Sequence, residues 1–267
     1  MTVADPGRLP ELLERMGGDV RTLMSQLAPG ESDAHSPLWR RRSRKRRLDV
    51  LTLPFAPAKA AASALGGSLN DFFVTGAVGG AARYHEARAV PVEALTVTFI
   101  VSTRTGRAEG GNAFAPSKAI LPAGPMPAAA RFEAVHRVLT ERRDEVSGDG
   151  LLSGFAGMVN LLPTSMATRV ARAQAGSVDF ATSNVRAAPF EVYVGGARVL
   201  ASYPVGPVAG TAWNVTLMSY AGRLDLGVHL DPVAVPDPDL LLSSLAAAYE
   251  ELYAAGGSPT SVSTDAW

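Results

Sequence analysis

Histidines are the side chains of this sequence best suited to acid–base catalysis, and only four occur: His35, His85, His136 and His229. The chain has no cysteine, which excludes a thiol nucleophile, a thiolate metal site and a disulfide. His85 lies near the end of a predicted helix, where an imidazolium would interact favourably with the helix dipole. None of the four has a sequence neighbour of the kind that orients a general base. We therefore expect no catalytic histidine and no metal site in this chain.

Short catalytic motifs are also absent from the sequence. It contains no Gly-x-Ser-x-Gly nucleophile elbow, no His-Glu-x-x-His zinc motif and no phosphate-binding Walker loop. Gly76 and Gly80 lie one helical turn apart beside Ala77 and Ala81, and no Gly-Lys-Ser/Thr follows them. Small residues at that spacing indicate close packing of a helix against a sheet or another helix, rather than a phosphate loop.

Length and composition indicate a globular protein with one large or two small domains, since 47% of the 267 residues are hydrophobic and 19% are charged. Alternating apolar and polar residues predict strands over residues 48–53, 95–101, 114–121, 178–185, 190–194, 197–203, 213–220 and 224–230. Helical spacing predicts helices over residues 57–65, 128–147, 151–161, 164–174 and 238–255, and a long helix beginning after Ser68. The predicted fold class is α/β (α+β), with a mixed, largely antiparallel sheet flanked by helices.

Local signals refine this prediction at two places. Ser68 and Asp71 stand three residues apart and can satisfy each other's free backbone donors, which predicts a capping box at the start of the long helix. Glycine-containing pairs at 195–196 and 221–222 predict two-residue turns between successive strands. We therefore expect the strands after residue 178 to form an antiparallel meander.

The two ends of the chain are predicted to lie outside the main domain. Residues 1–36 show helical spacing and are predicted to form a helical lead-in, and residues 257–267 are rich in Ser, Thr and Gly and are predicted to form a disordered tail. No secretory signal opens the sequence. Proline and asparagine interrupt the uncharged stretches at 150–168 and 199–222, which argues against membrane spans. The sequence predicts a cytoplasmic protein that is soluble or peripheral at a membrane.

The sequence resembles the second half of bacterial wax ester synthase/diacylglycerol acyltransferases in four stretches. They read GGSLNDFFVTGAVGGAARYH at 66–85, VSTRTGRAEGGNAFAP at 101–116, VDFATSNVRAAPF at 178–190 and YPVGPVAGTAWNVTLMSYAGRLDLGVHLD at 203–231. The stretches follow the family's order, and the resemblance covers roughly residues 37–256. It implies that these residues form an acyltransferase C-terminal lobe, one of the two lobes of a chloramphenicol-acetyltransferase-like fold.

The resemblance also implies an activity. Enzymes of the family transfer an acyl group from acyl-CoA, a co-substrate, to a long-chain alcohol or a diacylglycerol, giving a wax ester or triacylglycerol. Their catalysis is attributed to a His-His-x-x-x-Asp-Gly motif in the first lobe, whose second histidine would deprotonate the acceptor hydroxyl. This chain lacks that motif. We therefore expect no catalytic residue, no further cofactor and no turnover unless an N-terminal lobe is supplied. The alternative is a non-catalytic scaffold that binds a lipid surface or a partner.

Four polar residues match positions of the family and are predicted substrate contacts: Asn70, Asp71, Ser183 and Asn184. Structural explanations remain open beside this one. The capping box by itself accounts for Asp71, and Asn184 could hold a turn by bonding its own backbone. The loop that reads Asn-Val-Pro-Gly-Pro in many members is also altered here, since residues 186–189 are Arg-Ala-Ala-Pro.

A run of basic residues follows Trp39, although the whole chain is neutral, with 25 basic and 25 acidic residues. Its members are Arg40, Arg41, Arg42, Arg44, Lys45, Arg46 and Arg47. The run is a solvated surface, a clamp on the phosphates of coenzyme A or nucleic acid, or an anchor on the anionic lipid of the inner membrane or of lipid inclusions. In the third case Trp39 and the run form a membrane surface, and each basic group contributes about 1 kcal/mol. Nucleic-acid binding has little support because the predicted strands carry no aromatic platform interleaved with basic residues.

Overall fold

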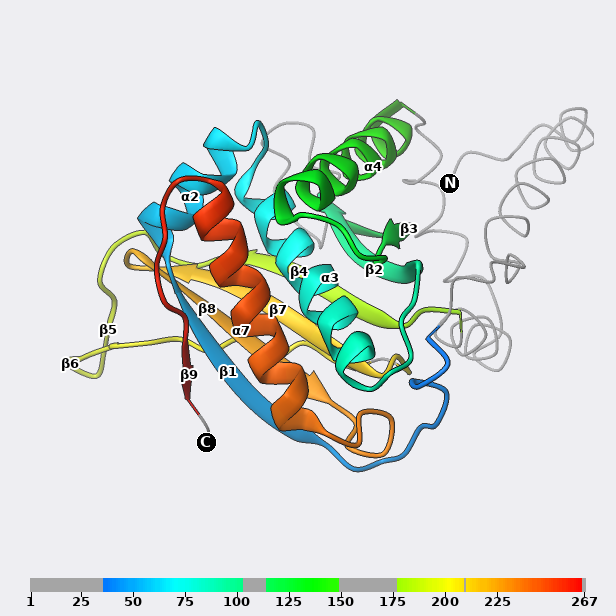
Figure 1. Ribbon diagram of the computed structural model, residues 1–267. Coiled ribbons are helices and arrows are strands. Elements are labelled where there is room, and N and C mark those ends of the chain that lie inside the picture. Colours follow the sequence, from blue (N-terminus) through cyan, green and yellow to red (C-terminus); the bar gives the residue numbers. More distant parts are fainter. Residues whose placement is uncertain (1–35, 103–113, 149–176, 209, 266–267) are drawn as a thin grey trace, which may run out of the picture.

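The computed structural model describes residues 36–102, 114–148, 177–208 and 210–265 (Figure 1). Three predictions fall outside these ranges: the helical lead-in, apart from Ser36, and the helices at 151–161 and 164–174. Within the described ranges, no helix is both long and apolar enough to cross a membrane.

A seven-stranded sheet forms the centre of the described chain, in the order β3-β2-β4-β7-β8-β1-β9. Its strands are β1 (Arg47–Pro54), β2 (Ala94–Ser102), β3 (Phe114–Pro122), β4 (Phe180–Arg186), β7 (Trp213–Tyr220), β8 (Arg223–Leu230) and β9 (Ser263–Asp265). Strand β4 pairs in parallel with both β2 and β7, and the remaining pairs are antiparallel. The predicted mixed, largely antiparallel sheet is therefore confirmed.

The predicted antiparallel meander after residue 178 is wrong. Among the described strands after residue 178, only β7 and β8 form a hairpin within the main sheet, across the turn at Ala221 and Gly222. β5 (Tyr193–Val194) and β6 (Ala197–Arg198) form a separate two-stranded ribbon and are much shorter than the strands predicted at 190–194 and 197–203. Alternation identifies residues that can form a strand, but the partner depends on the route of the chain, and here a long connection returns to place β7 parallel to β4.

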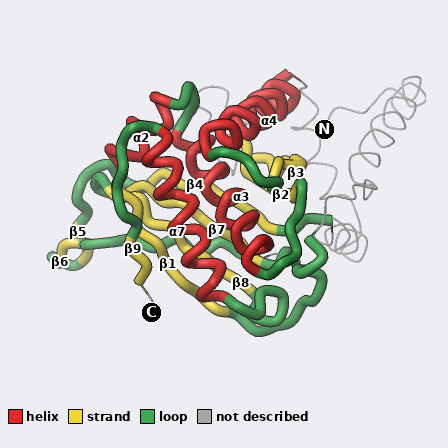
Figure 2. The backbone as a smooth tube through the Cα atoms, viewed as in Figure 1, coloured by secondary structure: helices red, strands yellow, loops and turns green. Residues whose placement is uncertain are grey.

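Helices cover one face of the sheet (Figures 1 and 2). They are α2 (Phe55–Ala64), α3 (Leu69–Ala87), α4 (Ala128–Gly148) and α7 (Pro238–Ala255). Helix α3 begins with the predicted capping box, because the Ser68 hydroxyl accepts from the Asp71 amide and the Asp71 carboxylate accepts from the Ser68 amide. In α7 the Asp237 side chain caps the helix and Pro238 occupies its first turn, where a missing amide hydrogen is harmless.

The α3–α7 contact explains the glycines in α3. A Cβ atom on Gly76 would lie 2.0 Å from Cε1 of Tyr249, and one on Gly80 would lie 2.7 Å from Cα of Leu245. The Tyr249 hydroxyl donates to the backbone carbonyl of Phe73 at 2.9 Å, which fixes the ring across the groove. The predicted close packing through a small-residue face is confirmed, with a helix as the partner.

The segment after β4 passes over the face of the sheet away from the helices. Gly227 on β8 permits this route, since a Cβ atom there would lie 1.7 Å from the carbonyl oxygen of Pro204. His229 binds the same segment, with Nδ1 2.7 Å from the carbonyl oxygen of Gly206. Because a carbonyl can only accept, Nδ1 carries the proton, and His229 has a structural role.

The end of the chain returns to the sheet as β9. Val50 of β1 pairs with Asp265 and Thr52 pairs with Ser263, and the Val262 amide donates to the Glu250 carboxylate at 3.0 Å. The prediction of a disordered tail over 257–267 is therefore wrong for the residues that form β9. Polar composition suggested disorder, but a short polar strand gains backbone hydrogen bonds when an unpaired edge such as that of β1 lies within reach.

Candidate functional site

Two of the four predicted substrate contacts meet where α3 begins and β4 ends. The side-chain amide of Asn184 donates to Oδ1 of Asn70 at 3.2 Å in an exposed position. The two residues are 114 positions apart in the sequence, so the fold brings them together. Ser183 is half-buried, and because side chains alternate along a strand it points to the other face of the sheet. The structure thus groups Asn70 with Asn184 and separates Ser183 from them.

Asp71 follows Asn70 but faces the interior, with its side chain only 1% exposed. One carboxylate oxygen, Oδ2, accepts from the Ser68 amide and the Ser68 hydroxyl, each at 2.8 Å. The guanidinium of Arg143 lies 4.0 Å from the other oxygen, Oδ1. Asp71 therefore holds the start of α3 and has no exposed surface with which to meet a substrate directly.

His136 of α4 completes this group. Its Nδ1 lies 2.9 Å from Oδ2 of Asp71, and its ring stacks on Phe132 with an angle of 12° between the planes. A carboxylate can only accept, so Nδ1 donates. The other ring nitrogen, Nε2, has no hydrogen-bond partner among the described residues, and the side chain is 38% exposed. An imidazole held by a buried carboxylate is an arrangement that orients a proton acceptor. The expectation that every histidine lacks such a partner is wrong for His136, because the two residues are 65 positions apart.

A family model described as the WS/DGAT C-terminal domain matches residues 110–253, more than half of the chain. The chain belongs to this family. A "putative diacylglycerol O-acyltransferase" of Mycobacterium tuberculosis H37Rv is 35% identical to this chain over 225 residues. The match covers 84% of the chain and 45% of the mycobacterial protein, so the chain spans less than half the length of that relative.

Solved structures share the fold of this chain. The wax ester synthase/diacylglycerol acyltransferase from Marinobacter aquaeolei VT8 superposes with a TM-score of 0.64 at 18% identity, over 95% of this chain and 58% of that one. The epimerization domain of tyrocidine synthetase B superposes with a TM-score of 0.53 at 10% identity, over 89% and 56% of the two chains. The described sheet and helices therefore correspond to one lobe of the chloramphenicol-acetyltransferase-like fold.

His85 belongs to a second, buried group of side chains. The Ser36 hydroxyl oxygen accepts from the amides of Leu38 and Trp39 and lies 2.6 Å from Nε2 of His85. The hydroxyl proton is therefore available for Nε2, while Nδ1 of His85 donates to the carbonyl of Ala81 at 2.7 Å. Burial lowers the pKa of His85, against a smaller opposing effect of the Ala81 carbonyl. The expected imidazolium at the end of α3 is wrong, because a fully buried ring favours the neutral form.

This burial predicts that the protein loses stability in mild acid. The folded pKa of His85 lies below its ordinary value of 6.5, so the stability of the fold is undiminished by this group above pH 6.5. As the pH falls below 6.5 the unfolded chain binds the proton first, so the free energy of unfolding decreases towards the folded pKa. Urea titrations at several pH values from 7.5 to 5 give the free energy of unfolding as a function of pH. We expect this free energy to fall with pH in the wild type and to fall less steeply in His85→Gln. Equal slopes would contradict the assignment.

The basic run separates into two kinds of residue. Arg42 donates to the carbonyls of Gly210 and Trp39, and Arg47 forms ion pairs with Asp49 at 2.8 Å and Asp239 at 2.5 Å. These two side chains hold the chain in place. The remaining basic residues of the run are exposed: Arg40, Arg41, Arg44, Lys45 and Arg46.

Trp39 does not fit the predicted membrane surface. Its side chain is 2% exposed, and its ring lies 5.7 Å from that of Trp213 and 4.5 Å from that of His85. An indole enclosed in this way cannot insert among lipid headgroups while the domain is folded. The predicted role of Trp39 at a membrane is therefore wrong. Its position before a basic run is typical of an interfacial anchor, but the ring packs in the core.

Proposed function

We propose that this chain supplies the C-terminal lobe of an acyl-CoA-dependent O-acyltransferase that makes wax esters or triacylglycerol. In the proposed reaction the acceptor oxygen attacks the thioester carbonyl, the C–S bond breaks, and coenzyme A leaves as a thiol that carries the hydroxyl proton. The base that moves this proton would come from a His-His-x-x-x-Asp-Gly motif in an N-terminal lobe. Support comes from the family match and from the fact that the chain covers only 45% of the mycobacterial relative.

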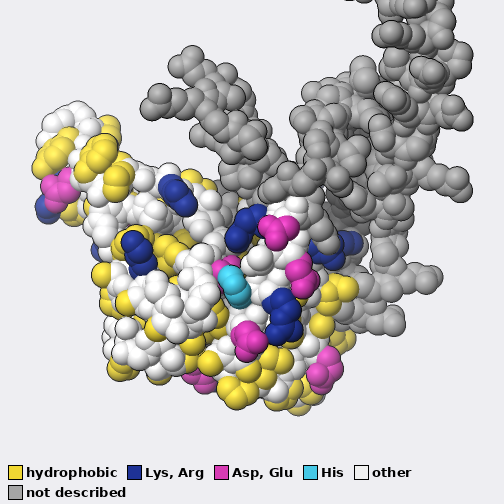
Figure 3. Space-filling model, turned by 90° about the horizontal axis from the view of Figure 1, so that it is seen from above, with side chains coloured by type: hydrophobic (Ala, Val, Ile, Leu, Met, Phe, Trp, Pro, Cys, Tyr) yellow, Lys and Arg dark blue, Asp and Glu magenta, His cyan; other side chains and the backbone are white. Residues whose placement is uncertain are grey.

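An exposed apolar projection is the observation that favours a missing partner lobe. The β5–β6 ribbon and its flanks expose more than half of each of four large apolar side chains: Phe190, Tyr193, Val194 and Leu200. Figure 3 shows apolar side chains gathered on the projection to the left, where Figure 1 places the ribbon. Apolar surface of this kind usually marks a contact with another protein or a membrane. We assign the ribbon to the contact with the N-terminal lobe.

The pair formed by the half-buried Asn70 and the exposed Asn184 is the proposed substrate contact. Each amide retains hydrogen-bonding groups beyond the single bond that joins the pair. Asp71 would act indirectly, because its buried carboxylate fixes Ser68 and His136 around the start of α3. Ser183 faces the opposite side of the sheet and could reach a substrate only from there.

Complementation tests this function. The full chain would be mixed or co-expressed with the N-terminal half of the mycobacterial relative, and with labelled acyl-CoA and either hexadecanol or a diacylglycerol. We expect no ester from either half alone and labelled ester from the two together. Replacing the second histidine of the motif in the N-terminal half should abolish that product. Ester formation by this chain alone would overturn the proposal that the base lies in the other lobe.

Within the complemented enzyme, Asn184→Ala should lower turnover about tenfold, which corresponds to the loss of about 1.4 kcal/mol of hydrogen bonding. Ser183→Ala is the matched control on the neighbouring position of β4 and should leave turnover within about twofold, since Ser183 faces the other side of the sheet. Initial rates of labelled ester formation at saturating acyl-CoA provide the measurement. Equal rates for Asn184→Ala and the wild type would exclude Asn184 as a substrate contact.

A second function, binding to an anionic lipid surface, is favoured by the exposed residues of the basic run. We expect the chain to sediment with vesicles containing phosphatidylglycerol at low salt, and to be released in high salt because the attraction is electrostatic. Replacing Arg40, Arg41, Arg44 and Lys45 by glutamine should abolish sedimentation, whereas Arg198→Gln, a distant exposed change, should not. Equal binding to neutral vesicles would contradict an electrostatic anchor. Vesicle binding without ester formation in any complementation would favour the non-catalytic scaffold.

A further inference from the structure

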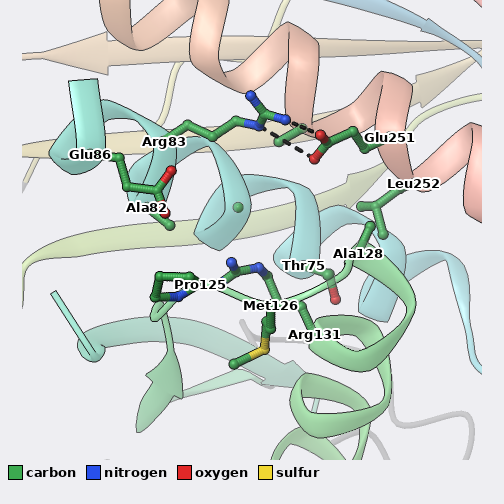
Figure 4. A pocket seen from close by; sticks show the side chains of 12 residues that line it. Thr75, Ala82, Arg83, Glu86, Pro125, Met126, Ala128, Arg131, Glu251 and Leu252 are labelled. Atoms are coloured by element: carbon green, nitrogen blue, oxygen red, sulfur yellow. Dashed lines mark hydrogen bonds and ion pairs between the residues drawn. The ribbon is translucent and has the colours of Figure 1, made fainter. Parts of the chain in front are cut away.

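A cavity of about 250 Å³ lies where α3, α7 and the start of α4 meet (Figure 4). Residues of all three helices and of the turn before α4 line it. Its volume equals that of about eight water molecules at roughly 30 Å³ each. A cavity of this size admits a small organic molecule and excludes a long acyl chain.

Arg131 of α4 places a buried positive charge beside this cavity. The residue is 7% exposed, and its guanidinium donates to the carbonyls of Pro122 at 2.9 Å and Gly124 at 3.0 Å. A guanidinium has five N–H donors, and neither carbonyl supplies a negative charge. Among the described residues, no carboxylate forms an ion pair with Arg131. Burial lowers the pKa of Arg131, and the charge of Glu86 opposes this effect only in part. Figure 4 shows the guanidinium within the cavity, near Pro125.

Thr75 of α3 adds a second polar group. Its side chain is 1% exposed and lines the same cavity, and its hydroxyl oxygen has no hydrogen-bond partner among the described residues. Most buried hydroxyls are hydrogen-bonded, because leaving one without a partner costs about 1–3 kcal/mol. A buried cation and a buried hydroxyl without a partner among the described residues thus line one small cavity, and both are groups that can bind an oxyanion.

The remaining lining limits the charge and shape of the ligand. Arg83 is paired with Glu251, so these two add no net charge, and Glu86 contributes a negative charge at the rim. A doubly charged phosphate would meet stronger repulsion from Glu86 than a singly charged ligand does, so the lining favours a single negative charge. Pro125, Met126 and Leu252 provide an apolar wall.

We propose that this cavity binds a short-chain monocarboxylate. Its oxygens accept from the free N–H groups of Arg131 and from the Thr75 hydroxyl, and its apolar body lies against Met126 and Leu252. Because the cavity joins three helices, an occupant that binds only the folded state stabilises the whole helical layer. The proposal does not depend on acyl transfer, since binding is measured on this chain without any acyltransferase activity.

Butyrate is the carboxylate chosen to test the site, with butanol and butylamine as neutral and cationic analogues of the same chain length. In thermal unfolding of the full chain, butyrate should raise the midpoint with saturation at millimolar concentrations, and the other two should not. Isothermal titration calorimetry should give one binding site per chain. An equal shift with butanol, or no saturable shift with butyrate, would overturn the proposal.

Two variants address the site without threatening the fold. Thr75→Val keeps the side-chain shape and removes the buried hydroxyl, and should weaken butyrate binding about tenfold. In Gly79→Ala the added Cβ would lie 3.2 Å from Cβ of Ala248 and 3.8 Å from Cδ of Arg131, which narrows the floor of the cavity and should abolish binding. Thr98→Val, a similar change on β2, is the control and should bind butyrate like the wild type. Wild-type affinity in both cavity variants would refute the site.

Discussion

Gly76→Ala is expected to lower the free energy of unfolding by about 3 kcal/mol, the upper part of the range for overpacked cores. The new Cβ would lie 2.0 Å from Cε1 and 2.3 Å from Cδ1 of Tyr249, far inside van der Waals contact. The ring cannot swing away, because it is fully buried and its hydroxyl is bonded to the carbonyl of Phe73 at 2.9 Å. Relief therefore requires α3 and α7 to separate, which disrupts the layer that covers the sheet.

Urea denaturation followed by circular dichroism measures this effect, with Gly79→Ala as the matched control. Gly79 lies on the same helix, and its added Cβ would be 3.2 Å from Cβ of Ala248, a contact that a small shift relieves. Replacing a helical glycine by alanine otherwise stabilises a helix by about 1 kcal/mol. We expect Gly79→Ala to be neutral or stabilising. If Gly76→Ala proved equally stable, the helices would be farther apart in solution than the structure describes.

Trp39→Ala is expected to cost about 3–5 kcal/mol, the usual result of truncating a buried tryptophan. The ring of Trp39 lies 5.8 Å from that of Tyr84, 6.2 Å from that of Phe180 and 5.7 Å from that of Trp213. Its backbone amide also donates to the Ser36 hydroxyl at 3.1 Å, so the substitution should loosen the contact between Ser36 and His85 as well.

The neighbouring change Arg40→Gln separates burial from membrane binding. Arg40 is exposed, so its replacement should leave the free energy of unfolding within about 0.5 kcal/mol of the wild type while weakening vesicle binding. Trp39→Ala should lower the free energy of unfolding and leave vesicle binding unchanged. A stable Trp39→Ala protein that no longer bound anionic vesicles would restore the membrane role that the structure denies to this residue.

Local sequence signals predicted the local structure well. The capping box at Ser68 and Asp71 forms because both partners lie within one turn, and Gly76 and Gly80 lie on one face because the helical period places them there. The order of strands could not be predicted in the same way. The alternation of apolar and polar residues in β4 is equally compatible with parallel and antiparallel neighbours. Which of the two forms depends on the route of the connections between the strands, and here β4 and β7 are parallel.

The candidate site was only partly accessible from the sequence. Asn70 and Asn184 were found through the family resemblance, and no periodicity could have paired residues 114 positions apart. His136 was missed for the same reason, because the carboxylate that orients it belongs to another helix. Trp39 was misassigned because the sequence shows its charged neighbours, whereas its aromatic neighbours come from α3, β4 and β7.

The short β9 strand also hinders edge-to-edge association between molecules of this protein. Without it, Leu51 and its neighbours on β1 would present unpaired amide and carbonyl groups along the rim of a large sheet, a template on which a second molecule could add its own rim. The three polar residues of β9 pair with Val50, Leu51 and Thr52 in the middle of that edge and add little apolar surface of their own. Removing the last ten residues would therefore expose the edge of β1 and favour edge-to-edge association of molecules.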